Sequence, residues 1–397
     1  MSSLKKNEMI QVRPEFKLKG FMPENLSKII STDEFSETRS RINRLISSDS
    51  FVSLSNKDKN YILKFQDGYD KSAKSQGLEE DEIILSGHEV VEFSNISDAD
   101  AYRYLIYRYK YNLFPELKIV DDYPPCVQIE PVSVCNFRCV FCYQSDESFS
   151  KKKFGHMGRM DIGLFKETID ELEGNVEAIT LASRGEPLLH KDIEEMIEYM
   201  NGKFLAVKIN SNASLLTEKL SHMILSNDIQ TMVFSIDAAN KELYEKLRVR
   251  GNFETTLDNV KNYHKIKNES YPNSKIITRI SGVKVNEMQN IEQMIDFWKP
   301  YADLVAFTNY TPWESSYDNP SNEISSPCTE LWRRLFIWWD GKVNPCDYDY
   351  KSYLSKWEMS DHSISSIWNS DDFRVLRDQH LDKRRKELTP CKSCISV

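Results

Sequence analysis

The sequence predicts an α/β protein built on a partial (β/α)6 barrel, with an N-terminal extension of mixed α/β structure and a small cysteine-rich C-terminal domain. Short apolar segments alternate with amphipathic segments six times between residues 126 and 307. This repeat implies parallel strands wrapped by helices. Three cysteines directly follow the first apolar segment, and four more lie beyond residue 327. Six β–α steps are fewer than the eight that close a complete barrel.

Composition and charge narrow the class of protein. The chain has 397 residues, of which 40% are hydrophobic and 28% charged, as in ordinary globular proteins. Its net charge of −9 argues against a nucleic-acid-binding protein. No apolar run approaches the ~18–20 residues that span a bilayer, and no secretory signal opens the chain. We therefore expect a cytoplasmic protein with no membrane association, whose eight cysteines serve metal or redox chemistry.

The N-terminal region, residues 1–123, carries no motif that indicates a role. Glu82–Phe93 looks strand-like, so we expect a strand there, and we expect a helix over Ala99–Leu113. The polar stretch over residues 66–80 is typical of a loop or linker.

The barrel is expected over residues 124–312, and the C-terminal domain over residues 313–397. The strands of the barrel are the short apolar runs Cys126–Val132, Val176–Leu181, Phe204–Ile209, Thr231–Ile236, Ile276–Val285 and Leu304–Phe307. Its helices place apolar residues three or four apart: Asp161–Leu172, Lys191–Met200, Thr217–Leu225, Phe253–Ile266 and Ile291–Trp298. Asp161 is a suitable N-cap for the first helix. Barrels of this kind bind ligands at the carboxyl ends of their strands.

A C-x3-C-x2-C motif, Cys135, Cys139 and Cys142, follows the first strand. Three thiolates can hold three irons of a [4Fe–4S] cluster and leave the fourth iron open, whereas most clusters have four thiolates. A zinc site or free core thiols are the alternatives. Structural zinc usually takes four protein ligands, and the nearest further candidate is His156. The motif resembles that of the radical S-adenosylmethionine (SAM) superfamily, whose open iron binds the amino and carboxylate groups of SAM.

Further resemblances to this superfamily follow the later strands in order. They imply SAM contacts for Phe141, Gly185, Glu186, Asn212, Ser235, Arg248 and Val283. The run from Ser183 to Pro187 resembles the superfamily's GGEP turn, with Arg184 in place of the first glycine. The resemblance implies that Arg248 pairs with the SAM carboxylate, which suits a two-pronged guanidinium, and Arg250 is a competitor for that role.

The other cysteine group has Cys328 and Cys346 separated by 17 residues, then Cys391 and Cys394 as C-x2-C. This pattern resembles the opening of the SPASM extension of radical SAM enzymes, and most closely the shortened, "twitch"-like module of aminocyclitol alcohol dehydrogenases. The resemblance implies a second, auxiliary [4Fe–4S] cluster saturated by four thiolates. A structural zinc site is the alternative, since four-cysteine sites with a C-x2-C half are common.

The resemblance implies reductive cleavage of SAM and abstraction of a hydrogen atom from substrate, with an electron supplied by a flavodoxin or ferredoxin. A saturated auxiliary cluster can accept an electron, which favours two-electron oxidation of a small polar molecule such as a sugar, nucleotide-sugar or aminocyclitol. Candidates for removing the hydroxyl proton lie at strand ends or beside Cys346: Arg279, Asn309, Tyr310, Asp347 and Asp349. A cysteine-dependent epimerase is disfavoured, because only Cys126 is left over, at the wrong end of its strand.

Two alternatives remain open. The first is a SPASM-type maturase that modifies a ribosomal peptide or a protein side chain, with a peptide-binding winged-helix domain in the N-terminal region. The second is a zinc-stabilised binding protein without chemistry, which the ordered strand-end motifs argue against.

Overall fold

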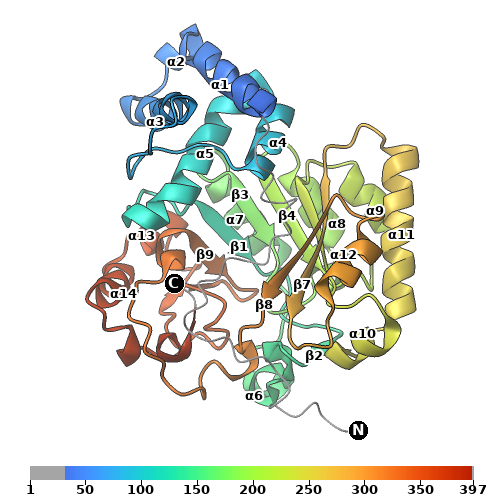
Figure 1. Ribbon diagram of the computed structural model, residues 1–397. Helices are drawn as coiled ribbons and strands as arrows, with labels where there is room; N and C mark the ends of the chain where they lie inside the picture. The colour runs from blue at the N-terminus through green and yellow to red at the C-terminus, as the bar shows by residue number, and fades with distance from the viewer. Residues whose placement is uncertain (1–31, 396–397) are drawn as a thin grey trace. The chain divides into compact units, whose positions relative to one another are not determined.

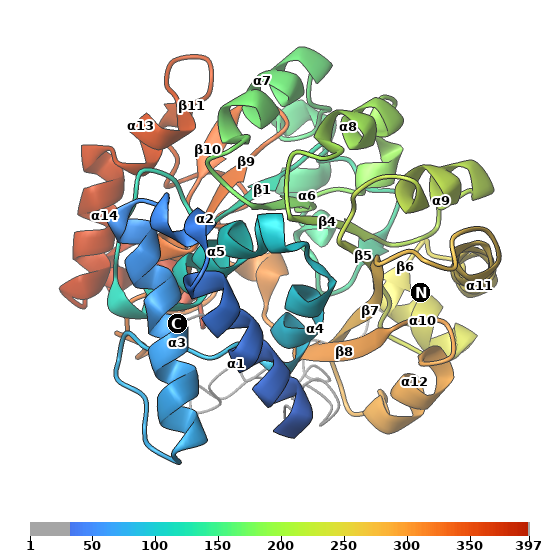
Figure 2. The ribbon, with the colours of Figure 1, turned by 90° about the horizontal axis from the view of Figure 1, so that it is seen from above.

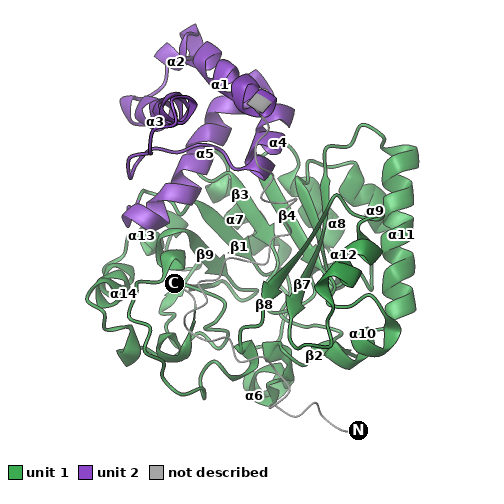
Figure 3. Cartoon of the chain, in the orientation of Figure 1, with its two compact units in different colours: residues 1–21, 121–397 green, residues 22–120 purple. Residues whose placement is uncertain are grey.

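The computed structural model describes residues 32–395. Two compact units divide the chain, one within residues 22–120 and the other containing residues 121–397 (Figure 3). Figure 1 shows the second unit as a sheet with helices on its outer side, and this unit contains all eight cysteines.

The first unit contains helices and, within residues 32–120, no strand. Its helices are α1 (Thr32–Ile46), α2 (Asp49–Val52), α3 (Asn56–Ala73), α4 (Gly87–Asn95) and α5 (Asp98–Leu117). The predicted helix over Ala99–Leu113 is confirmed within α5. The strand predicted over Glu82–Phe93 is wrong: the Ser86 N–H donates to the Glu89 carboxylate at 2.7 Å, which starts α4. The predicted loop over residues 66–80 begins only after Ala73, where α3 ends.

The second unit is built on one sheet, in the order β11-β10-β9-β1-β3-β4-β5-β7-β8. Six parallel strands form the predicted partial barrel: β1 (Cys126–Ile129), β3 (Ala178–Leu181), β4 (Ala206–Ser211), β5 (Thr231–Ser235), β7 (Ile277–Lys284) and β8 (Leu304–Asn309). All six strands lie at their predicted positions. The two ends of the sheet, β11 and β8, do not pair with each other, so the barrel stays open.

Helices follow the strands and cover the outer side of the sheet (Figure 2). They are α7 (Ile162–Leu172), α8 (Ile193–Met200), α9 (Glu218–Leu225), α11 (Phe253–Ser270) and α12 (Ile291–Trp298). Two shorter helices, α6 (Glu147–Ser150) and α10 (Lys241–Leu247), lie in the loops that follow β1 and β5 (Figure 1). The Asp161 side chain caps α7 and the Thr217 side chain caps α9, each accepting a backbone N–H of its own first turn. The five predicted barrel helices are therefore confirmed.

The C-terminal region extends the same sheet. Strand β9 (Arg334–Ile337) runs parallel to β1, and β10 (Lys342–Asn344) and β11 (Trp357–Glu358) continue antiparallel from it. Helices α13 (Ile364–Trp368) and α14 (Asp371–Leu381) follow. A separate two-stranded ribbon, β2 (Arg138–Cys139) and β6 (Arg248–Val249), lies in the loops after β1 and α10. The pairing of β9 with β1 joins the two cysteine-containing regions through main-chain hydrogen bonds.

Candidate functional site

The first cysteine group lies in the loop after β1. Cys139 is buried in β2, and Cys135 and Cys142 are partly buried. Backbone N–H groups of Phe137 and Gln144 point at the sulfurs of Cys135 and Cys142, at 3.4 and 3.5 Å. Burial raises the pKa of the Cys135 thiol to about 12, and the neighbouring Cys139 adds to this. Three neighbouring buried thiols, which stay protonated when no metal is bound, fit a cationic iron site, since a bound metal deprotonates its thiols.

Arg248 faces this group from β6. Its guanidinium lies 3.9 Å from the Cys139 sulfur, forms a 2.6 Å ion pair with Asp237, and is 5.8 Å from the centre of the Phe141 ring. Asp237 in turn accepts the backbone N–H of Val283 at 2.7 Å. Of the two competing arginines, Arg248 faces the cysteines, whereas Arg250 is exposed.

The turn after β3 packs directly on the cysteine loop. A Cβ on Gly185 would lie 2.1 Å from the Val132 carbonyl oxygen, so only glycine fits there. The buried Glu186 carboxylate accepts the Ser211 hydroxyl and the Asn212 backbone N–H, both at 2.7 Å. Asn212 and Glu186, predicted from separate strand ends, are therefore in contact.

A cavity of about 410 Å³ opens beside the cysteine loop, within the usual size of a ligand pocket. It lies at the carboxyl ends of β7 and β8, and its lining residues are Phe141, Cys142, Tyr143, Val283, Thr308, Asn309, Thr311, Trp313 and Asp347. Of the candidates for acting on a hydroxyl group, Asn309 and Asp347 line this cavity. The other three do not: Asp349 binds Tyr317 at 2.8 Å, Tyr310 binds Glu314, and Arg279 lies on β7.

The second cysteine group consists of Cys328, Cys346, Cys391 and Cys394. Burial raises the pKa of the Cys346 thiol far above its usual value, and its three partner cysteines raise it further, which places the four side by side. Cys328 donates its backbone N–H to His380 at 3.2 Å, and Arg385 donates to the Cys394 carbonyl at 3.0 Å. Across residues 32–395, no three His, Cys, Asp or Glu side chains are arranged as ligands of a single metal ion such as zinc.

Comparison with known proteins agrees with this arrangement. The radical SAM superfamily model matches residues 129–297, and the SPASM model, an iron–sulfur cluster-binding domain, matches residues 328–395. The chain belongs to the radical SAM superfamily. These two domains imply SAM and two iron–sulfur clusters as its cofactors.

Individual relatives of this radical SAM enzyme are distant. Mycofactocin maturase MftC of Mycolicibacterium smegmatis is 25% identical over 176 residues, 44% of this chain and 41% of that protein. The AdoMet-dependent heme synthase of Methanosarcina barkeri is 30% identical over 135 residues, 34% of this chain and 37% of that protein. The chain thus spans about two fifths of these curated relatives. The structure of Streptococcus suis SuiB bound to precursor peptide SuiA shares the fold, with a TM-score of 0.53, 15% identity, and coverage of 90% of this chain and 86% of that one.

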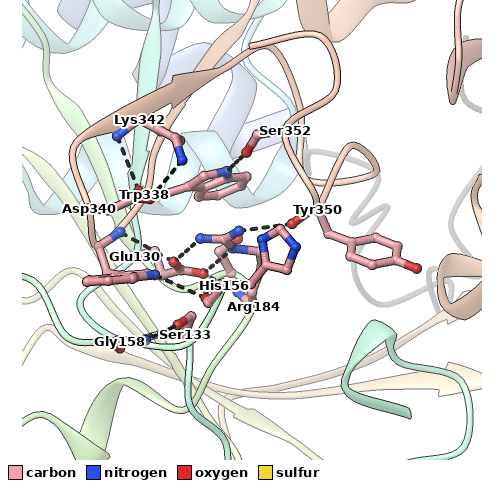
Figure 4. Close-up of polar contacts among 12 residues, drawn as sticks. Glu130, Ser133, His156, Gly158, Arg184, Trp338, Asp340, Lys342, Tyr350 and Ser352 are labelled. Carbon is pink, nitrogen blue, oxygen red and sulfur yellow. Dashed lines mark hydrogen bonds and ion pairs between the residues drawn. The ribbon is translucent and has the colours of Figure 1, made fainter. Parts of the chain in front are cut away.

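Arg184 is the site feature of this radical SAM enzyme that sequence reasoning missed. Its guanidinium forms a fully buried ion pair with Glu130 at the end of β1, with contacts of 2.5 and 2.7 Å (Figure 4). It also donates to the Tyr350 carbonyl at 2.9 Å and lies 4.2 Å from the centre of the Trp338 ring. Arg184 therefore ties the turn after β3 to the segment that follows Cys346.

The remaining predicted positions lie at the same end of the sheet. Ser235 ends β5, where it pairs with Ser281 of β7. The Asn212 amide donates to the Asn136 side chain, within the cysteine motif, at 3.0 Å. Cys126 is buried at the opposite end of β1.

No helix within residues 32–395 is long and apolar enough to cross a bilayer.

Proposed function

We propose that this radical SAM enzyme carries out a two-electron oxidation of a small polar molecule, converting an alcohol carbon to a carbonyl. The cavity is the observation that supports this most directly. Cys142 of the first cysteine group lines one part of it, and Asp347, which directly follows Cys346, lines another. A substrate held there lies between the two groups, as an oxidation that uses both requires.

The chain's own residues bind and enclose this substrate. When bound, SAM and the two clusters supply hydrogen-atom abstraction from carbon and an acceptor for the second electron. Asn309 and Asp347 hold the substrate hydroxyl by hydrogen bonds. As the carbon loses a hydrogen atom and an electron, the hydroxyl proton passes to the Asp347 carboxylate. Tyr143 and Trp313, whose ring centroids lie 6.1 Å apart, form an aromatic wall that excludes water.

In the same proposal, the first cluster is held by Cys135, Cys139 and Cys142, and the auxiliary cluster by the four C-terminal cysteines. SAM lies against Phe141, Val283 and the turn at Gly185 and Glu186. Further SAM contacts are assigned to Asn212, Ser235 and Arg248. A flavodoxin or ferredoxin delivers the electron, and the enzyme works in the cytoplasm.

A substrate panel tests this function. The anaerobically reconstituted full chain is incubated with SAM, dithionite and in turn sugars, nucleotide-sugars and aminocyclitols deuterated at their carbinol carbons. We expect a carbonyl product, trapped with a hydrazine, and deuterium in the 5′-deoxyadenosine in about equal amount. Deuterated 5′-deoxyadenosine formed with a product of unchanged oxidation state would contradict an oxidation. The Cys391→Ser/Cys394→Ser variant serves as a control that retains SAM cleavage and loses the carbonyl product.

Peptide modification is the second candidate, and the 25% identity with mycofactocin maturase MftC favours it. The described part of the N-terminal unit gives it no support, because residues 32–120 contain no strand and a winged helix includes a β-hairpin. Including short peptides in the same panel separates the candidates: a mass change of −2 on a peptide, with none of the small molecules oxidised, would favour the maturase.

A further inference from the structure

Two basic side chains face the barrel interior from different strands. Asn210 of β4 pairs with Val233 of β5, which pairs with Arg279 of β7. Residues paired in this way point to the same face of the sheet. Lys208 lies two residues before Asn210 on the same strand, so Lys208 points to the same face as Asn210, Val233 and Arg279. Arg279 shares its face with Val283, four residues later, which lines the cavity. Lys208 and Arg279 thus lie inside the barrel, below the cavity.

Neither cation has a hydrogen-bonded or ion-paired anion within residues 32–395, and the Glu330 carboxylate acts on Lys208 only from a longer distance. Among residues 32–395, the Lys208 ammonium and the Arg279 guanidinium make no hydrogen bond or ion pair, and the Arg279 Nε is buried without a partner. Both side chains are partly buried. Burial, with Arg334 and Arg279 nearby, lowers the pKa of Lys208 to about 8. Withdrawing two cations from water without an anion is costly, so the arrangement is suited to binding one.

The two nearby carboxylates, Glu330 and Asp347, contact side chains other than Lys208 and Arg279. Glu330 pairs with Arg333 at 2.7 Å and with Arg334 at 3.6 Å. Asp347 accepts a hydrogen bond from Gln128 at 3.5 Å, and the positive charge of Arg334 acts on its carboxylate. Arg334 also donates to Gln128 at 3.4 Å. Within residues 32–395, Lys208 and Arg279 are therefore interior cations without an anion at hydrogen-bond distance.

We propose that Lys208 and Arg279 form an anion subsite that binds a phosphate or carboxylate of the substrate. The inference rests on the proposed function, since it names the substrate class of that reaction. Guanidinium and ammonium together match an oxyanion. Val283 lies about 13 Å further along the strand than Arg279, at about 3.3 Å per residue. The substrate is therefore an extended molecule with its anion remote from the reacting carbon, such as a nucleotide-sugar, and a cationic aminocyclitol is disfavoured.

Anion binding tests this subsite without turnover. Inorganic phosphate, and separately acetate, are titrated by calorimetry into the anaerobically reconstituted full chain saturated with SAM. We expect binding that weakens about tenfold or more in Lys208→Met and in Arg279→Gln, because each loses a charged hydrogen bond. Lys241→Met, which removes an exposed cation on α10, should bind as the wild type does. Preference for phosphate over acetate, or the reverse, identifies the anion.

Three results would overturn the subsite. The first is no binding of either anion to the wild type, and the second is equal binding in wild type, Lys208→Met and Arg279→Gln. The third is weakened SAM binding in both variants with anion binding unchanged, which would assign the cations to the cofactor. Lys208→Arg keeps the charge and should retain binding, so it controls for a folding defect in Lys208→Met. Because the readout is anion affinity, the subsite can hold even if no carbonyl product is found.

Discussion

The Arg184 guanidinium and the Glu130 carboxylate form an ion pair in which both side chains are at most 2% exposed. Glu130 follows β1, and Arg184 follows β3 in the turn where the superfamily motif has glycine. The same guanidinium reaches the Tyr350 carbonyl, four residues beyond Cys346. One side chain thus fixes three segments around the two cysteine groups.

Breaking this pair should destabilise the enzyme strongly. Arg184→Leu leaves the Glu130 carboxylate buried without its partner, and we expect a loss of about 3–5 kcal/mol in the free energy of unfolding. Urea unfolding followed by tryptophan fluorescence measures it, since Trp338 and Trp339 contact the pair. Arg374→Leu removes a surface pair with Asp371 and should leave the midpoint unchanged. An Arg184→Leu midpoint equal to the wild type would show that the pair contributes nothing.

A methyl group at residue 185 should disturb the first cysteine group. In Gly185→Ala the new Cβ meets the carbonyl oxygens of Val132 and Val134, at 2.1 and 2.6 Å. The cysteine loop must move, so we expect iron per chain to fall from about eight toward about four. Gly77→Ala, at a position with nothing within 4 Å, is the matched control and should keep its iron. Full iron in Gly185→Ala would mean that the loop adjusts without losing the cluster site.

The two cysteine groups should bind iron independently. We expect about eight irons in the reconstituted wild type, and about four in both the Cys135→Ala/Cys139→Ala/Cys142→Ala and the Cys391→Ser/Cys394→Ser variants. The first variant should form no 5′-deoxyadenosine, whereas the second should still cleave SAM. Iron, sulfide and zinc analysis of the three proteins is the measurement. One zinc retained in the first variant would show that the C-terminal cysteine group is a zinc site.

Acid should destabilise the enzyme through His190. Its ring is buried, it bonds the Met160 carbonyl at 2.8 Å, and burial lowers its pKa below the usual value. A histidine with a lower pKa when folded binds its proton more readily when unfolded. The contribution of His190 to the free energy of unfolding is complete above about pH 6.5, and it is lost as the pH falls from there toward the pKa of the folded state.

Urea midpoints at several pH values between 7.5 and 5 measure this effect. His190→Gln should show a shallower fall in stability with acid than the wild type. His362→Gln, which replaces an exposed histidine, should follow the wild type. If stability fell equally steeply with acid in wild type and His190→Gln, His190 would not be the source of the acid sensitivity.

The sequence predicted the barrel well because its determinants are local. Each strand is a short apolar run, and helix starts such as Asp161 and Thr217 carry their own capping side chains. The error over Glu82–Phe93 had a local signal too. Ser86 and Glu89 form the S-x-x-E pattern of a capping box, which outweighs the short apolar run Ile83–Leu85 before it.

The parts that were missed depend on residues far apart in the chain. Strand β9 pairs with β1 from more than 200 positions away, and no local pattern specifies a partner strand. In the sequence, Arg184 is only a departure from the glycine of the superfamily motif, because its partners, Glu130 and Tyr350, are remote in sequence. Likewise, Lys208 stood out only once the register placed it on the same face as Arg279.

The pairing of β9 with β1 also bears on how this enzyme avoids aggregation. Without residues beyond 312, β1 would become an edge strand, with apolar Val127 and Ile129 beside a row of unpaired backbone groups. Such an edge is a template for pairing between chains. The C-terminal region therefore protects the barrel sheet as well as carrying cysteines, and a shortened chain would be expected to accumulate as insoluble protein before any loss of chemistry could be measured.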